Sequence, residues 1–335
     1  MQIDGVKALV EEKYDLNIQS IEKIKNVYKI YTNEDNYCLK VINYNFPHFL
    51  FILSAIKHLQ NNGFEKIPEI IKNKKKEDYI SIEKSYAYLT PWINCRECNY
   101  DNPLDLKLAT IKLAQLHNKS LGFNVTDNMN PRIGWKQWEK SFKNKKQEII
   151  KFRNIIIKKW RTTEFDNAYL KSMSEEIRRI DEGLKNLQKT NYFNKMREEM
   201  EKKGFCHHDY AHHNILIEDN KKVNLIDFDY CILDTHLHDL CSLIIRVMKN
   251  GKWDIKNAIN ILDCYSNIYP IKQDDIPIMA AFIEFPQAYW QLGIQYYFEK
   301  QPWGEEFFIN KLAKICEDKD ERQGFVNEFR ILKYG

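Results

Sequence analysis

Glycine and proline are scarce in this sequence, whose 335 residues include only 11 glycines and 9 prolines. No internal repeat or low-complexity segment is present either, so the chain offers no obvious flexible linker. Apolar residues make up 44% and charged residues 29%, which is typical of a folded globular protein and excludes a disordered one. A chain of this length forms one large domain or two lobes of ordinary size.

Neither sign of charge dominates, because 51 basic and 47 acidic residues leave a net charge of +4. This bias is too weak to indicate a nucleic acid or a membrane surface as partner. No apolar run approaches the length of about 18 residues that a membrane-spanning helix requires. The segment from Met1 to Gly5 lacks the basic and apolar pattern of a secretory signal, so we expect synthesis in the cytoplasm.

The cysteines are scattered and offer no disulfide framework. Two of the eight, Cys95 and Cys98, form a lone Cys-x-x-Cys pair. A zinc site usually needs a second ligand pair at matching spacing, and the sequence contains no convincing one. We therefore interpret all eight as ordinary reduced thiols.

Short β-rich runs dominate the first hundred residues, with one helical pattern among them. The predicted strands are 18–24, 27–32, 36–42, 68–71, 78–83 and 86–90, and the predicted helix is 47–62.

From residue 102 the pattern becomes helical, except for one predicted β-hairpin formed by 214–217 and 223–227. The predicted helices are 104–118, 135–159, 166–189, 255–267, 275–299 and 305–317. Strands followed by helices indicate an α+β protein with a small mixed β lobe and a large, mainly α lobe. We place the amino-terminal lobe at residues 1–93 and the carboxyl-terminal lobe at residues 94–335.

The most specific motif surrounds the predicted hairpin. His207 and Asp209 form a His-x-Asp pair, Asn214 follows five residues later, and Asp227 comes thirteen residues after that. Asn214 lies directly before the first strand of the hairpin and Asp227 at the end of the second, so both reach the same edge.

Phosphoryl transfer requires this set of side chains. One carboxylate must lie beside the attacking hydroxyl, while an asparagine and a second carboxylate hold Mg²⁺ against the phosphates of the nucleotide. The spacing matches a kinase catalytic loop followed by its metal-binding aspartate. Lys40 closes the third predicted strand, where a kinase lysine contacts the α- and β-phosphates. An exposed strand lysine is the alternative, but the order of the other motif residues favours the phosphate contact.

With these residues, the chain resembles the kinase-like fold of aminoglycoside phosphotransferases and choline kinases. It resembles more closely the CotS-type spore coat proteins of endospore-forming bacteria. The similar segments run over nearly the whole length: 28–30, 37–40, 53–59 with Gly63 and Phe64, 113–117, 164–166, 206–217 and 226–229.

The resemblance implies a bilobal protein-kinase-like fold and a role for each motif residue. Asp209 would be the catalytic base or hydroxyl-orienting group, and His207 would brace the catalytic loop. Asn214 and Asp227 would ligate Mg²⁺, and Lys40 would bind the phosphates of ATP.

The resemblance also implies a hinge that hydrogen-bonds adenine. This hinge would be the backbone around Leu89, Thr90, Trp92 and Ile93, in the nucleotide-binding amino-terminal lobe. The catalytic loop and the acceptor site would belong to the carboxyl-terminal lobe.

Three departures from the family pattern concern the same site. Residues 23–27 contain no glycine where kinases carry a glycine-rich loop. The predicted helix 47–62 contains no Asp or Glu, so Lys40 lacks the acidic partner that usually positions it. His208 stands where the relatives usually have glycine.

Other readings of single residues remain open. The four histidines His207, His208, His212 and His213 could hold a transition metal, although the kinase pattern already explains the residues between them. Asp229 adds a carboxylate near the metal or caps a turn. The aromatic residues from Phe285 to Trp303 line an acceptor pocket or, as we favour, pack in the core, and Glu284 among them could contact a bound amine.

Two functions follow from the sequence. The first is an ATP- and Mg²⁺-dependent phosphotransferase that transfers the γ-phosphate to an unidentified hydroxyl acceptor. The alternative is a catalytically weak or inactive kinase-fold protein with a structural role in the spore coat. In both cases we expect location in the spore coat, other coat proteins among the partners, and neither nucleic acid nor membrane as a partner.

Overall fold

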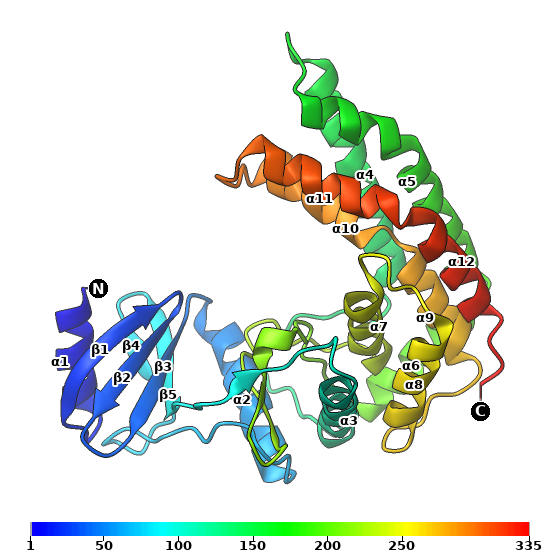
Figure 1. The fold of residues 1–335 in the computed structure, drawn as a ribbon. Helices are drawn as coiled ribbons and strands as arrows, with labels where there is room; N and C mark the ends of the chain where they lie inside the picture. The colour runs from blue at the N-terminus through cyan, green and yellow to red at the C-terminus, as the bar shows by residue number, and fades with distance from the viewer. Residues whose placement is uncertain (1, 335) are drawn as a thin grey trace. The chain divides into compact units, whose positions relative to one another are not determined.

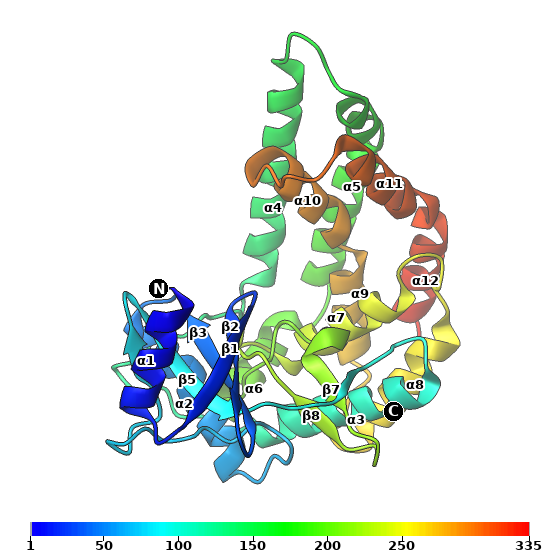
Figure 2. The ribbon, with the colours of Figure 1, turned by 60° about the vertical axis from the view of Figure 1, so that its left-hand side comes forward.

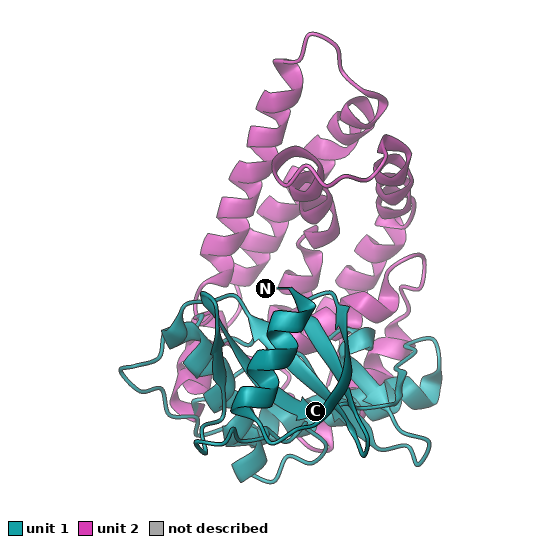
Figure 3. Ribbon diagram, turned by 90° about the vertical axis from the view of Figure 1, so that its left-hand side faces the viewer, with its two compact units in different colours: residues 1–132, 203–233 teal, residues 133–202, 234–335 magenta. Residues whose placement is uncertain are grey.

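The computed structural model describes residues 2–334 (Figure 1). They divide into two compact units, coloured separately in Figure 3. The first unit contains the residues up to 132 together with 203–233, and the second contains 133–202 and the residues from 234 onward. Within residues 2–334, no helix has both the length and the apolar character needed to cross a bilayer. The lobe boundary expected between residues 93 and 94 stays a prediction.

The first unit is built on a five-stranded antiparallel sheet with strand order β1-β2-β3-β5-β4. Five of the six predicted strands are confirmed, three of them with the predicted bounds, and the predicted strand 68–71 is reduced to a single bridge between Ile71 and Leu89. The strands are β1 (Ile18–Ile24), β2 (Val27–Thr32), β3 (Asn36–Ile42), β4 (Ile80–Ile82) and β5 (Ser85–Pro91).

Helix α1 (Ile3–Lys13) belongs to the core of this sheet, although the sequence analysis did not predict it. Val6, Val10 and Tyr14 are spaced by four residues, so they share one face, and all three are buried in the core cluster of the sheet. Its mean hydropathy is low because the other faces are polar. Packing against the sheet, rather than local propensity, therefore stabilises this helix.

Helix α2 (Phe46–Asn61) forms within one residue of the predicted bounds. The side chain of Asn45 caps its first turn by accepting a hydrogen bond of 3.0 Å from the backbone N–H of His48. The chain leaves the helix through Gly63, whose φ of +70° lies in the left-handed region that glycine adopts without strain.

A smaller three-stranded sheet, also in the first unit, carries the predicted hairpin. Its strands are β6 (Arg96–Glu97), β7 (Ile215–Ile217) and β8 (Val223–Leu225), in that order, and the short 3₁₀ helix η1 (His212–Asn214) leads into β7. Figure 2 shows the hairpin beside α3 (Pro103–Lys119). Arg96 ties β6 to this helix by donating two hydrogen bonds, of 2.6 and 2.8 Å, to the carboxylate of Asp105.

The described part of the second unit is helical. Its α-helices are α4 (Trp138–Ile157), α5 (Glu164–Gln188), α6 (Tyr192–Lys202), α7 (His236–Met248), α8 (Ile255–Ser266), α9 (Asp275–Glu284), α10 (Gln287–Gly293), α11 (Glu305–Glu317) and α12 (Lys319–Arg330), and a short π-helical segment, η2 (Ile294–Phe298), continues α10. The predicted continuous helix 275–299 is wrong, because Pro286 interrupts it. Proline lacks an N–H and forces the preceding residue out of the helical region, and Phe285 accordingly has ψ +129°.

Aromatic side chains form most of the core between α4, α5 and α10. Phe285, Tyr289 and Tyr297 from the aromatic stretch are buried there, which favours core packing over an acceptor pocket. Gly293 is enclosed by this core, since a methyl group on it would overlap the Tyr169 hydroxyl and lie 2.6 Å from a ring carbon of Phe152.

Two buried carboxylates in the second unit already have partners. Glu284 accepts a 2.6 Å hydrogen bond from Arg330, so it is not available to a bound amine. On α6, Oε2 of Glu199 lies 2.7 Å from Nδ1 of His236, and Oε1 of Glu199 accepts a 2.9 Å hydrogen bond from Nζ of Lys202. Although burial opposes ionisation, these charges hold the pKa of Glu199 well below its ordinary value.

Candidate nucleotide site and catalytic loop

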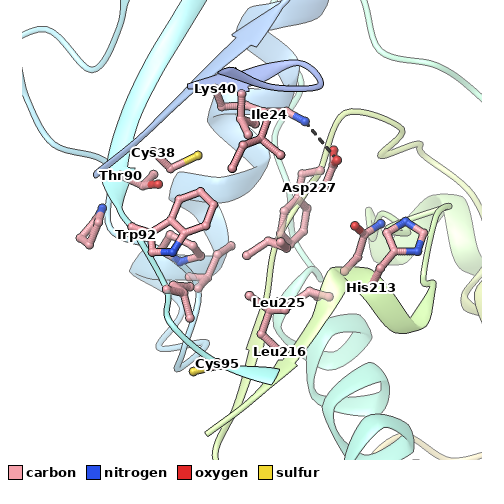
Figure 4. A pocket seen from close by; sticks show the side chains of 18 of the residues that line it. Ile24, Cys38, Lys40, Thr90, Trp92, Cys95, His213, Leu216, Leu225 and Asp227 are labelled. Carbon is pink, nitrogen blue, oxygen red and sulfur yellow. Dashed lines mark ion pairs between the residues drawn. The ribbon is translucent and has the colours of Figure 1, made fainter. Parts of the chain in front are cut away.

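A cavity of about 390 Å³ lies within the first unit, and Figure 4 shows the side chains around it. Its walls come from the β1–β2 turn, from β3, from the chain that follows β5, and from the β7–β8 hairpin. The turn contains no glycine. Instead Lys25 adopts the left-handed conformation, with φ +56°, and lines the cavity next to Asn26.

Lys40 reaches the cavity from β3, where it pairs with Val27 on one side and Tyr88 on the other. It is 5% exposed, and its Nζ lies 3.0 Å from Oδ2 of Asp227 and 3.0 Å from Oδ2 of Asp229. Burial alone would lower the pKa of Lys40, but the charges of Asp229 and Asp227 raise it above its ordinary value. Lys40 therefore remains an ammonium group at the wall of the cavity.

These two carboxylates replace the acidic partner that α2 does not supply. Ile56 is the α2 residue that lines the cavity, and it is buried and apolar. Asp229 comes from the turn after β8, two residues beyond Asp227, and its backbone N–H donates a 3.4 Å hydrogen bond to Oδ1 of Asp227. Of the two readings left open for Asp229, the structure favours a carboxylate that contacts Lys40. The only sequence signal for this contact was an aspartate where a protein kinase has glycine.

The two aspartates titrate differently although they are neighbours. Burial opposes ionisation of Asp227, yet the nearby Lys40 holds the pKa of this carboxyl below its ordinary value. Burial and the charge of Asp227 raise the pKa of Asp229 to about 6. Asp227 also has φ +65°, a strained backbone conformation for a residue other than glycine. Figure 4 shows the carboxylate of Asp227 pointing toward the ammonium group of Lys40.

The residues of the candidate catalytic loop are linked to the same hairpin by hydrogen bonds. His207 is fully buried, and its Nε2 lies 3.0 Å from the backbone oxygen of Ile226, next to Asp227. The Asn214 amide nitrogen donates to the backbone oxygen of Asp209 at 2.9 Å and to its Oδ2 at 3.2 Å. The backbone N–H of Ile226 donates to the oxygen of Asn214 at 3.0 Å. The structure thus brings together His207, Asp209, Asn214 and Asp227, as the spacing predicted.

His208 adopts a backbone conformation that is uncommon for a residue with a side chain. Its φ is +67°, in the left-handed region where glycine carries no penalty and other residues are uncommon. The backbone therefore keeps the conformation that a glycine would favour, and His208 bears the strain.

The predicted hinge is only partly exposed to the cavity. Thr90, Trp92 and Ile93 line it, whereas Leu89 does not. The Leu89 side chain is fully buried in the core of the sheet, and its backbone oxygen accepts a 2.8 Å hydrogen bond from the N–H of Ile71. The structure therefore places Leu89 in the core behind the cavity and not on its wall.

The sequence contains two further groups of side chains of metal-ligating types, the loop histidines and the Cys-x-x-Cys pair. Among residues 2–334, the four histidines of the loop do not form a cluster of metal-ligating atoms. His207 is buried behind the loop, and His213 lines the cavity. Burial raises the pKa of Cys98 to about 12 and also raises that of Cys95, so both thiols are harder to ionise than a free cysteine.

The chain is similar to known proteins over almost its whole length. A model of the family described as "Spore coat putative kinase YutH" matches residues 7–329. Spore coat protein S of Bacillus subtilis (strain 168) is 23% identical over 317 residues, which cover 94% of this chain and 90% of that protein.

Solved structures of small-molecule kinases share the fold. An aminoglycoside phosphotransferase from Alicyclobacillus acidocaldarius has a TM-score of 0.82 at 21% identity, with 96% of this chain and 95% of that chain covered. A spectinomycin phosphotransferase in complex with ADP and spectinomycin has a TM-score of 0.71 at 15% identity, with 99% of both chains covered. An amicoumacin kinase in complex with AMP-PNP and Ca²⁺ has a TM-score of 0.65 at 12% identity, with 99% and 96% covered. The predicted α+β, protein-kinase-like fold is confirmed.

Proposed function

Because the chain belongs to the spore coat kinase family whose model spans residues 7–329, as its resemblance to CotS-type proteins indicated, we propose that it is an ATP- and Mg²⁺-dependent phosphotransferase of the spore coat. Its acceptor would be a hydroxyl group of a small molecule or a coat protein. The observation that carries the proposal is the buried Lys40–Asp227 ion pair at the wall of a cavity of about 390 Å³.

The cavity suits a nucleotide in size and in the placement of its charges. Its volume falls in the range of small-molecule sites, and its walls are mainly apolar, with polar groups at one end. Thr90, Trp92 and Ile93 would flank the adenine at the apolar end. Lys40 and Lys25 at the other end would meet the phosphates, with Lys25 compensating for the missing glycine-rich loop.

Asn214 and Asp227 would hold the divalent cation. Mg²⁺ prefers oxygen ligands such as a carboxylate and an amide oxygen, and the lowered pKa of Asp227 keeps its carboxylate ionised. The bound cation would offset the negative charge that develops on the phosphates during transfer.

Asp209 would orient the acceptor hydroxyl and take its proton. The hydroxyl oxygen bonds to the γ-phosphorus while the bond from that phosphorus to the bridging oxygen of ADP breaks, and the released proton passes to the carboxylate of Asp209. The hydrogen bond from Asn214 fixes Oδ2 of Asp209 beside the proposed metal site. His207 contributes indirectly, because its hydrogen bond to Ile226 holds the loop against the hairpin.

Nucleotide binding is tested by thermal unfolding of the purified protein with ATP, in the presence and absence of Mg²⁺. A ligand that binds only the folded state raises the melting temperature by mass action. We expect a Mg²⁺-dependent rise for the parent, a loss of that dependence in Asp227→Asn, and no change in Asp219→Asn. Asp219 is an exposed residue of the β7–β8 turn, so it is a matched control for the removal of one carboxylate charge. No rise for the parent at millimolar ATP contradicts the proposal.

Catalysis is tested separately with Asp209→Ala. This variant should bind Mg²⁺–ATP like the parent and lose transfer to acceptors found by screening. Transfer at the parent rate would exclude Asp209 as the catalytic base.

A structural role in the coat is the second candidate, and the match to a spore coat family favours it. Under this hypothesis Asp209→Ala assembles into the coat of sporulating cells as the parent does, and the protein shows no transfer. Loss of assembly in Asp209→Ala would connect the coat role to the catalytic loop.

A further inference from the structure

A second cavity, of about 380 Å³, lies within the first unit and shares no lining residue with the proposed nucleotide site. It is formed by the chain that follows α2, by one face of α3, and by the turn and first residue of β8. Five lysines line it, with Glu65 as the single acidic lining residue: Lys66, Lys112, Lys119, Lys221 and Lys222. The proposed phosphotransfer uses none of them.

Lys112 forms the buried base of this cavity. Lys112 is 5% exposed. Its Nζ donates a hydrogen bond to the backbone oxygen of Glu65 and lies 3.9 Å from the centre of the Phe64 ring. An ammonium group has three hydrogen-bond donors, and the Glu65 carbonyl satisfies one. No carboxylate within residues 2–334 forms an ion pair with Lys112. Burying a cation is costly, and burial lowers the pKa of Lys112 to about 8 although the charge of the nearby Glu65 opposes this shift.

The lysines at the rim add to this excess of positive charge. Nζ of Lys66 forms an ion pair with Oε1 of Glu218 at 2.7 Å, which neutralises the charge of this lysine. Lys119, Lys221 and Lys222 form no ion pair with any residue that the structure describes. Several cations around one concave site focus a positive potential into it, because the surrounding protein has a low dielectric constant.

We propose that this cavity binds a small phosphate-bearing anion, with its phosphate oxygens on the ammonium group of Lys112. Lysine binds phosphate as a point charge, and a group of lysines suits a multivalent anion better than a single carboxylate. The volume leaves room for a molecule larger than inorganic phosphate. Rim lysines on the β7–β8 turn would contact its outer groups.

Pyrophosphate is a suitable probe, titrated calorimetrically into the full chain at low ionic strength without Mg²⁺ or nucleotide. The parent should bind one pyrophosphate, and Lys112→Met should bind it about tenfold more weakly or worse, since a hydrogen bond to a charged group is lost. Lys107→Met is the matched control, because Lys107 is an exposed residue of the same helix and does not line the cavity. Lys40→Met removes the phosphate contact of the proposed nucleotide cavity, so the pyrophosphate binding that this variant retains belongs to the second cavity. Lys107→Met should bind as the parent does.

The rim gives a second test if Lys112→Met does not fold, which circular dichroism will reveal. Lys221 and Lys222 are exposed, so changing both to serine should leave the fold intact and still weaken binding severalfold.

Four results would overturn the proposal: no binding by the parent, equal binding by a folded Lys112→Met, equal loss in Lys107→Met, or loss in Lys40→Met alone. Citrate that binds as tightly as pyrophosphate would overturn the assignment to phosphate. None of these outcomes depends on whether the protein binds ATP.

Discussion

Replacing Asp229 with asparagine tests whether this carboxylate positions Lys40 for the nucleotide. Oδ2 of Asp229 lies as close to the Lys40 ammonium group as Oδ2 of Asp227 does, at 3.0 Å. The lysine side chain is 6% exposed, so solvent screens these contacts little. Asparagine has nearly the same shape as aspartate but carries no charge. The substitution therefore removes one of the two charges that hold Lys40.

The size of the effect depends on what occupies Asp227. Without metal, Asp227 still pairs with Lys40, and the variant loses little. With Mg²⁺ on Asp227, only Asp229 remains to hold the lysine. A hydrogen bond to a charged group contributes about 1.5–3 kcal/mol, so the affinity for Mg²⁺–ATP should fall about 10- to 100-fold.

Calorimetric titration of Mg²⁺–ATP into the parent, Asp229→Asn, Asp229→Glu and the control Asp219→Asn measures this effect. We expect Asp229→Glu to recover part of the affinity and Asp219→Asn to match the parent. Affinity of Asp229→Asn within twofold of the parent would refute the positioning role. Absence of binding in every protein, including the parent, would instead refute the proposed nucleotide site.

Three further predictions concern stability and reactivity. Gly293→Ala should lower the free energy of unfolding by about 1–3 kcal/mol, because the added methyl group overlaps the aromatic core. Gly324→Ala, in open space on α12, should raise the free energy of unfolding by about 0.5–1 kcal/mol. Urea unfolding measures both values, and similar values for the two variants would contradict the packing argument. The pKa of Glu199 is lowered by folding, so its contribution to stability is present above its unfolded pKa and is lost as the pH falls. Glu199→Gln should therefore be less stable than the parent at pH 7. Chemical unfolding at several pH values should show the difference in unfolding free energy between the two proteins shrinking toward about pH 3. Cys95 lines the proposed nucleotide cavity and is half-buried, so Mg²⁺–ATP should slow its alkylation, while the buried Cys98 should react slowly with or without nucleotide. Peptide mass spectrometry distinguishes the two thiols. Alkylation of Cys95 at an unchanged rate in saturating nucleotide would argue against its place in the site.

Local patterns were sufficient for the elements that carry the candidate site. The strands that position Lys40 and the hairpin that positions Asp227 were both predicted, because alternating or continuous β-branched residues between polar turns are local signals. Helices α1, α6, α7 and α12 were not among the predicted ranges. In α1, α6 and α12 many residues are polar and only a few side chains on one face are buried, whereas α7 is largely apolar and was missed in spite of that. Their stability comes from packing partners that are distant in the sequence.

The order and spacing of the residues in the candidate catalytic loop were determined by the sequence alone, because they lie within one short segment and the hairpin that follows it. Three features depended on the tertiary structure: the second carboxylate on Lys40, the burial of Leu89 behind the cavity wall, and the cavity lined by lysines around Lys112. Each arises from segments that are far apart along the chain. Charge and burial act through distance in space, and no spacing rule within a single element predicts which distant side chains will meet.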